Sequence, residues 1–244
     1  FSMPPSFDEM RISGSEVRDH YRTYERWLLA QPAQLMRDRI DEAEMIFRRV
    51  GITFAVYGAK DEDANSANAG TERLIPFDLI PRVIPSHEWE DMEKGLRQRV
   101  TALNRFLHDV YHDQEILKAG QVLNNAQYRP EMRGVNVPGG VYSHIAGVDI
   151  VRAANPDGSG SYHVLEDNLR VPSGVSYMLE DRKMMMRLFP DLFAMHRVAP
   201  VAHYPDLLLE TLRAVAPAGV VDPTVVVLTP GMYNSAYFEH AFLA

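Results

Sequence analysis

His163–Ser176 reads HVLEDNLRVPSGVS and is the most informative stretch of this 244-residue chain. Glu166 and Asn168 stand two positions apart in it, directly after an apolar run. In a β-strand, residues two apart point to the same side, so a carboxylate and a carboxamide would face one spot. Arg170 follows close behind. Oxygen ligands next to a positive charge favour a site for a hard cation such as Mg²⁺ and for a phosphate group.

A turn and a second strand precede this stretch. The segments 141–152 and 162–168 flank Asn155–Gly160, whose sequence NPDGSG is a strong turn signal. The two segments are therefore predicted to pair as an antiparallel β-hairpin.

The expected register of the hairpin brings a second carboxylate to the site. With the turn centred between Asp157 and Gly158, Asp149 lies opposite Glu166. Facing residues have Cβ atoms roughly 5 Å apart, and two carboxylates so close repel each other unless a cation or a proton lies between them. A slip of one residue would turn Asp149 to the other face of the hairpin.

Neighbouring residues allow more than one interpretation. Asp167 points away from Glu166, which favours a structural role as a cap or an ion-pair partner. The turn at Ser173 and Gly174 precedes a helical pattern. Ser173 could cap that helix, or the start of the helix could bind a phosphate; the sequence leaves both open.

The remaining elements follow from periodicity and from turn residues. Helices are expected at 15–50 with a break at Gln31-Pro32, at 86–111, at 175–188 and at 205–216. Strands are expected at 52–57 and, buried, at 224–228, with a solvated loop at 60–71. A last helix, 235–244, is expected to begin with Ser235 as its N-cap. Met184–Met186 cannot all face one side of a helix, so core filling with partial exposure is expected.

Composition and charge limit the function classes. The chain is 46% hydrophobic and 24% charged, has a net charge of −8 and contains no cysteine. An acidic chain argues against a general binder of nucleic acids or anionic membranes, and the lack of cysteine excludes disulfides and thiolate chemistry. No apolar stretch is long enough for a transmembrane helix, and no signal peptide is recognisable. These features favour a cytoplasmic protein without nucleic-acid or membrane partners.

Several segments together resemble the circularly permuted ATP-grasp proteins, which are similar to the synthetase domain of glutathionylspermidine synthase. The most specific is HVLEDNLRVPSGVSYMLEDR at 163–182. The others are IPFDLIPRVIPSHEW at 75–89, RFLHDVYHDQEIL at 105–117, RPEMRGV at 129–135, GVYSHIAGVDIVR at 140–152 and PGMYNSAYFEHAFLA at 230–244. The resemblance covers most of the chain and corresponds to the N-terminal part of such proteins.

The resemblance implies an ATP- and Mg²⁺-dependent carboxylate–amine ligase that acts through an acyl phosphate. Asp149, Glu166 and Asn168 would be the metal ligands. Arg170 would be the catalytic residue that contacts phosphate or substrate, and Ser173 and Gly174 would add to the nucleotide site. The partners would be small carboxylate and amine substrates, peptide-like ones among them.

The fold that follows from the resemblance is α+β or α/β, ATP-grasp-like in permuted order, with an antiparallel sheet that carries the metal site. Residues 1–137 are expected to form a mostly helical N-terminal region with one or two strands. Residues 138–222 would form the permuted ATP-grasp segment with the metal-binding hairpin. Residues 223–244 would be the first strand and helix of a further α/β domain, with the remainder of the same protein packing on that helix.

Two departures from the family pattern qualify these expectations. Glutathionylspermidine synthases place an arginine, a phosphate contact, two residues before the metal-binding aspartate, where this chain has Gly147. Arg152 or Arg170 could take its place. The permuted order also puts the ATP-clasping lysines later than Ala244, so this chain is expected to be inactive alone.

Two other functions compete with the ligase. Asp149 and Glu166 could form a metal-independent acid/base pair for hydrolysis. Alternatively, the chain could be a degenerate ATP-grasp scaffold or binding module without catalysis, for which Gly147 is the main support.

Overall fold

The computed structural model describes residues 6–55, 72–120 and 129–244, and it divides the chain into two compact units. The first unit comprises 84–172 together with 1–7, and the second comprises 8–83 and 173–244. Each unit joins elements that lie far apart in the chain, and the three expected segments, 1–137, 138–222 and 223–244, stay predictions. The predicted loop at 60–71 and the end of the predicted strand at 52–57 lie outside the described residues.

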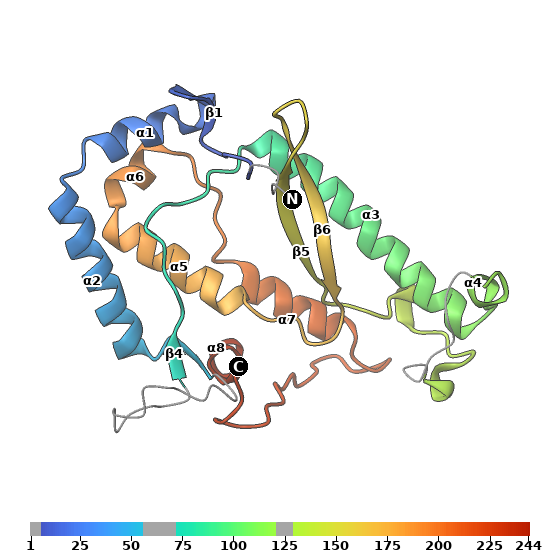
Figure 1. The fold of residues 1–244 in the computed structure, drawn as a ribbon. Coiled ribbons are helices and arrows are strands. Elements are labelled where there is room, and N and C mark those ends of the chain that lie inside the picture. The colour runs from blue at the N-terminus through green and yellow to red at the C-terminus, as the bar shows by residue number, and fades with distance from the viewer. Residues whose placement is uncertain (1–5, 56–71, 121–128) are drawn as a thin grey trace, which may run out of the picture. The chain divides into compact units, whose positions relative to one another are not determined.

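The first unit is a long helix with a hairpin along it. The helix α3, Ser86–Tyr111, has the predicted bounds, and the hairpin consists of β5, Gly147–Ala154, and β6, Gly160–Asn168. Figure 1 shows the hairpin running alongside α3. The short helices are α4, Glu115–Lys118, η2, Pro130–Met132, and η3, Pro138–Gly140.

Asn104 of α3 fixes the segment that leads into the hairpin. Its carboxamide oxygen accepts hydrogen bonds from the backbone N–H groups of Tyr142 and Ser143, at 2.7 and 2.9 Å. Its amide nitrogen donates to the Ser143 carbonyl at 3.3 Å. The side chain thus satisfies backbone groups as a neighbouring strand would, and it ties the approach to β5 to the long helix.

The second unit is mostly helical. Its helices are η1, Asp19–Tyr21, α1, Arg22–Leu29, α2, Ala33–Val50, α5, Val175–Leu188, α6, Pro190–Met195, α7, Tyr204–Ala214, and α8, Tyr237–Leu243. Two small antiparallel pairs accompany them: β1, Arg11–Ser13, with β2, Glu16–Val17, and β3, Thr53–Ala55, with β4, Glu72–Leu74. This mixture of helices and small antiparallel sheets fits the expected α+β class.

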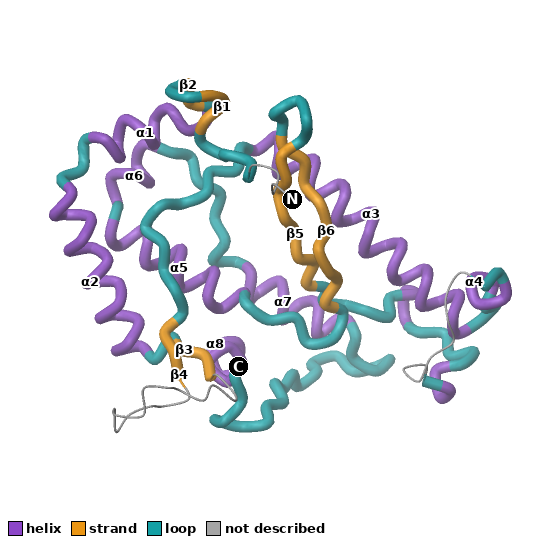
Figure 2. The backbone as a smooth tube through the Cα atoms, in the orientation of Figure 1, coloured by secondary structure: helices purple, strands orange, loops and turns teal. Residues whose placement is uncertain are grey.

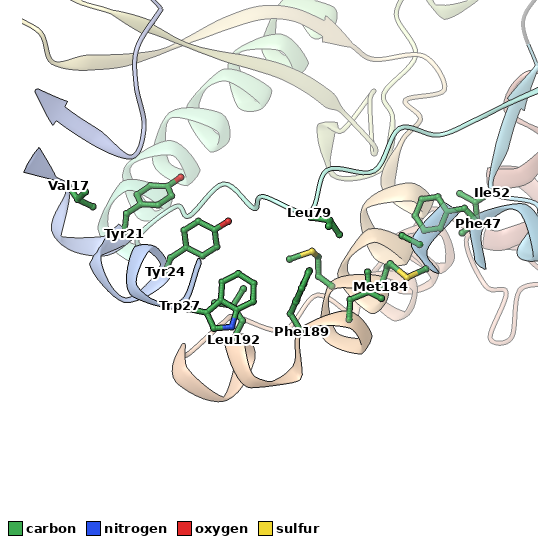
Figure 3. Close-up of a cluster of buried hydrophobic side chains, with 13 residues drawn as sticks. Val17, Tyr21, Tyr24, Trp27, Phe47, Ile52, Leu79, Met184, Phe189 and Leu192 are labelled. Carbon is green, nitrogen blue, oxygen red and sulfur yellow. The ribbon is translucent and has the colours of Figure 1, made fainter. Parts of the chain in front are cut away.

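The core of the second unit lies among α1, α2, α5 and α6 (Figure 3). The rings of Trp27 and Phe189 meet edge to face, with centroids 5.0 Å apart. Met184 and Met185 are buried, whereas Met186 is 53% exposed. This confirms that the three adjacent methionines divide between core and surface, because successive residues of a helix point in different directions.

Helix bounds agree with the sequence prediction in the interior of the chain and differ near the ends. Helix 175–188 is confirmed, and the break at Gln31-Pro32 separates α1 from α2. Ser15 does not begin a helix, because the chain there forms β2 and pairs with β1. The first residue of α8 is Tyr237, and its N-cap is Ala236 rather than Ser235.

The predicted buried strand at 224–228 is not formed. Figure 2 shows the chain between α7 and α8 as loop, and Val226 and Leu228 are 70% and 88% exposed. A strand needs the backbone hydrogen bonds of a neighbouring strand, and none of the described strands pairs with this segment. High β-propensity alone was therefore an insufficient signal.

The described part of the chain contains no helix that is long and apolar enough to cross a membrane.

Asp181 on α5 should make stability depend on pH. One of its carboxylate oxygens is buried without a hydrogen-bond partner among the described residues. Burial, with a contribution from the Glu180 charge, raises the pKa of Asp181 to about 6. The folded state thus binds this proton more tightly than the unfolded state, so the group lowers stability above pH 6 and ceases to do so as the pH falls toward 4.

Asp181→Asn is therefore expected to stabilise the protein at pH 7.5 by about 1 kcal/mol, a value reduced because the partly buried group is screened by solvent. Urea unfolding of both proteins at pH 7.5 and pH 4 measures the difference. The gain should vanish at the lower pH, and a gain of equal size at both values would contradict this account.

Candidate metal and phosphate site

The hairpin brings the three predicted metal ligands to one face. Gly147 pairs with Asn168, and Asp149 pairs with Glu166, which confirms the predicted register at this end. Directly opposed residues of an antiparallel pair share a face. Asp149, Glu166 and Asn168 therefore lie together on the side of the hairpin away from α3.

A β-bulge creates this arrangement. From Ile150 toward the turn, the pairs are Ile150 with Val164 and Ala154 with Gly160, so Leu165 has no partner. The turn is thus centred on Asp157 rather than between Asp157 and Gly158. Without the extra residue, that turn would pair Asp149 with Leu165 and place Glu166 on the opposite face. The bulge compensates for the shifted turn and rebuilds the predicted acid pair.

The three side chains are within reach of one another. The Asn168 amide nitrogen donates to a Glu166 carboxylate oxygen at 3.2 Å and to an Asp149 oxygen at 3.5 Å. A hydrogen bond with the Glu166 carboxyl raises the pKa of Asp149; desolvation and the Glu166 charge add to the rise, and the Asn168 amide opposes it. The two carboxylates are close enough to repel each other, and a cation bound between them would relieve that repulsion.

The donor set fits a hard cation. Two carboxylates and a carboxamide offer the oxygen ligands that Mg²⁺ prefers, leaving further positions for water and phosphate. Asn168 would have to turn its amide so that the oxygen faces the ion. Across the described ranges, no three His, Cys, Asp or Glu side chains gather as a metal-binding group, so the candidate depends on the carboxamide as its third ligand.

Arg170 remains available for an anion. It is exposed, and it makes no hydrogen bond or ion pair with the described residues. The next residue, Val171, has a φ of 53°, which is unusual for a β-branched side chain and marks a strained backbone. The segment after β6 thus holds Arg170 at the end of the hairpin in an irregular conformation.

Arg152, the other arginine considered as a phosphate contact in place of one at position 147, has a structural role. Its guanidinium forms two 3.0 Å hydrogen bonds with Glu88 of α3, and its side chain is only 9% exposed. The group also lies over the rings of Phe7 and Tyr162, at 4.3 and 4.8 Å from their centroids. A guanidinium engaged in this way is not free for phosphate, which leaves Arg170 as the candidate.

Gly147 is required by its surroundings. A Cβ atom at this position would lie 2.7 Å from the Pro172 Cβ and 3.5 Å from the Asn168 Cβ. The first distance is far below van der Waals contact, so an arginine here would have to displace Pro172. The glycine and the proline fit together, and this close packing gives a local physical reason for a glycine at position 147.

Ser173 and Gly174 belong to the second unit, at the start of α5. The N-cap residue is Gly174, and no side chain caps the helix in that role. Instead, a carboxylate from α8 lies at this end: Glu239 accepts hydrogen bonds from the Gly174 backbone N–H at 2.6 Å and from the Ser176 hydroxyl at 2.9 Å. Glu239 is 3% exposed. It occupies the position of an anion at a helix N-terminus.

Asp167 lies on the other face of β6 and pairs with Arg99 of α3. Two guanidinium nitrogens contact its two carboxylate oxygens at 2.7 and 2.5 Å. A hydrogen bond from Arg99 lowers the pKa of Asp167, which therefore stays charged at neutral pH. The predicted structural role of Asp167 is confirmed. Its partner was missed, because Arg99 is 68 residues away and carries no local signal.

Comparison with known proteins identifies the class. Residues 81–244, more than half of the chain, match the family model described as a circularly permuted ATP-grasp. The chain belongs to this family.

Similar proteins occur in several bacteria. An uncharacterized protein of Synechocystis sp. is 42% identical over 98% of this chain and 48% of its own length. One of Mycobacterium tuberculosis is 44% identical over 98% of this chain and 41% of its own length. A Frankia casuarinae protein named "Putative glutamate--cysteine ligase 2-2" is 37% identical over 99% of this chain and 27% of its own length. The chain therefore spans less than half of these curated relatives.

Proposed function

We propose that this chain supplies the Mg²⁺- and phosphate-binding hairpin of an ATP-dependent carboxylate–amine ligase. The observation that carries the proposal is the placement of Asp149, Glu166 and Asn168 on one hairpin face by the Leu165 bulge. Membership of the circularly permuted ATP-grasp family supports it. So does the name of the Frankia relative, "Putative glutamate--cysteine ligase 2-2".

Each residue of the site has a part in this proposal. Bound Mg²⁺ neutralises phosphate charge and so favours phosphoryl transfer to a carboxylate. Asp149, Glu166 and Asn168 hold the ion at the end of the hairpin. Arg170 is exposed and follows these residues in the sequence. It binds a phosphate oxygen or the substrate carboxylate, for which a guanidinium is well suited.

Other parts of the expectation stay predictions. Amino acids or short peptides are the substrate class that fits the relative's name. Four further expectations are also predictions: similarity to glutathionylspermidine synthase, a cytoplasmic location, packing of further chain on α8, and a contribution of Ser173 and Gly174 to nucleotide binding. So is inactivity of this chain alone, which an assay of ATP-dependent phosphate release with candidate amines would check.

Glu166→Gln and Asn168→Ala are each expected to weaken Mg²⁺-dependent binding of a non-hydrolysable ATP analogue about tenfold or more. Outer-shell groups of metal sites already contribute about 10–100-fold, and these residues are placed as direct ligands. Isothermal titration of the analogue with and without Mg²⁺ measures the effect.

Glu115→Gln provides the matched control, because Glu115 is an exposed acid of the same unit, on α4. Its affinity should stay within about twofold of the wild type, since exposed charges interact weakly. Unchanged binding in both site variants would remove these residues from the metal site and leave the scaffold alternative as the better interpretation.

A further inference from the structure

The E-D-N sequence at the end of β6 serves two faces of the hairpin. Glu166 and Asn168 face the candidate metal site, and Asp167 between them faces α3. The Arg99–Asp167 contact is bidentate, which fixes the orientation of a carboxylate as well as its distance. The Asp167 side chain is 17% exposed and that of Arg99 is 42% exposed, so the bidentate geometry rather than burial distinguishes this pair from a typical surface pair.

The hairpin depends on such polar contacts because apolar packing against α3 is incomplete. A hollow of about 730 Å³ lies between the helix and the hairpin. Its apolar walls include Met92 and Leu96 of α3 and Ile150 and Val164 of the hairpin. Side chains across a gap of this kind lose dispersion contacts, so they hold the strands only loosely.

The bulge adds to this freedom at the site. Beyond the unpaired Leu165, only three residue pairs connect β6 to β5. Bulges bend a strand and interrupt its hydrogen-bond ladder, so the ladder alone constrains the directions of Glu166 and Asn168 weakly. Asp167 is the residue in this short segment that is tied to the helix.

We propose that Arg99 is a positioning residue for the cation site and acts through Asp167. By holding the central residue of E-D-N against α3, it keeps the two flanking side chains directed at the ion. The proposal rests on the proposed function, because it requires Glu166 and Asn168 to bind a metal.

A positioning role and a purely electrostatic role of Arg99 predict opposite changes in metal affinity when Arg99 is replaced. A nearby positive charge repels a divalent cation, so a purely electrostatic role predicts tighter metal binding when the charge is removed. A positioning role predicts weaker binding despite the removed repulsion. The sign of the change therefore distinguishes the two.

The test titrates the 244-residue chain with Mn²⁺ as the probe. Paramagnetic broadening of backbone amide signals in NMR spectra measures the binding. Arg99→Gln is expected to weaken Mn²⁺ binding about three- to tenfold, below the range for groups bonded directly to a ligand. Arg99→Lys, which cannot form the bidentate contact, should fall between. The exchange R99D/D167R, which restores the ion pair in reverse, should recover most of the affinity.

Arg97→Gln is the matched control, since it removes the same charge two residues away from an exposed pair with Glu93 on α3. The Mn²⁺ affinity of this control should be unchanged.

Tighter or unchanged Mn²⁺ binding in Arg99→Gln would overturn the proposal. If that variant does not fold, Arg99→Lys is judged by the same criterion. Glu166→Gln separates the two levels: if it leaves Mn²⁺ binding unaffected, the proposed function itself fails. If it weakens binding while Arg99→Gln does not, only the positioning role fails.

Discussion

Glu88→Ala is expected to destabilise the helix–hairpin unit by about 3–5 kcal/mol, the usual cost of leaving one partner of a buried ion pair alone. Glu88 accepts two hydrogen bonds from Arg152, whose side chain is 9% exposed, and a third at 2.9 Å from the Tyr162 hydroxyl. Alanine leaves a buried guanidinium without its counter-charge. Among the described residues, the Arg152 Nε already has no hydrogen-bond partner, and the Tyr162 hydroxyl, at 3.3 Å from another guanidinium nitrogen, supplies no counter-charge.

Chemical unfolding followed by tryptophan fluorescence and far-UV circular dichroism measures the loss. Glu90→Ala, an exposed acid on the same helix, should change stability by less than about 0.5 kcal/mol. Adding Arg152→Met to Glu88→Ala should recover a large part of the loss, because replacing both partners is far less costly than removing one. Equal effects of Glu88→Ala and Glu90→Ala would show that the pair does not stabilise the unit.

Glu239→Ala is expected to destabilise the second unit by about 2–4 kcal/mol. Two hydrogen bonds to a charged group are lost, and the Gly174 N–H and the fully buried Ser176 hydroxyl are left without partners. The negative charge at the start of α5 disappears as well, which removes a favourable interaction with the helix dipole. Glu239→Gln should have a smaller effect, because its amide oxygen can still accept one of the two hydrogen bonds.

Thermal and urea unfolding of the two variants measure these effects. Glu210→Ala, an exposed glutamate of α7 in the same unit, provides the control and should remain close to the wild type. In a Ser176→Ala background, Glu239→Ala should be less harmful, since one of the two orphaned donors is absent. Additive effects of Glu239→Ala and Ser176→Ala would contradict a direct contact between them.

Local patterns predicted a large part of the fold. Helical periodicity and the Gln31-Pro32 break defined α1 and α2, and the bounds of α3 and α5 agree with the prediction. The 224–228 segment shows the limit of such reasoning, because strand formation depends on a partner. α6 was missed as well: Phe189 ends α5, and Pro190 starts a new helix in which its missing N–H is harmless.

The hairpin shows where local and tertiary information meet. The sequence by itself determined that a turn lies near NPDGSG and that Glu166 and Asn168 point one way while Asp167 points the other, because a strand has a period of two. Only the structure revealed that the turn is shifted and that Leu165 bulges to compensate. Both choices depend on the balance of backbone hydrogen bonds and packing along two strands, which no single residue encodes.

The partners of the polar side chains were likewise decided only by the tertiary structure. Arg99 with Asp167, Arg152 with Glu88, and Glu239 with Gly174 are 68, 64 and 65 residues apart. Each group must find a counter-charge or a hydrogen-bond partner once it is buried. The sequence shows which side chains are acidic or basic and therefore have this need. Which partner meets the need depends on which elements pack together, a property of the folded unit rather than of any local pattern.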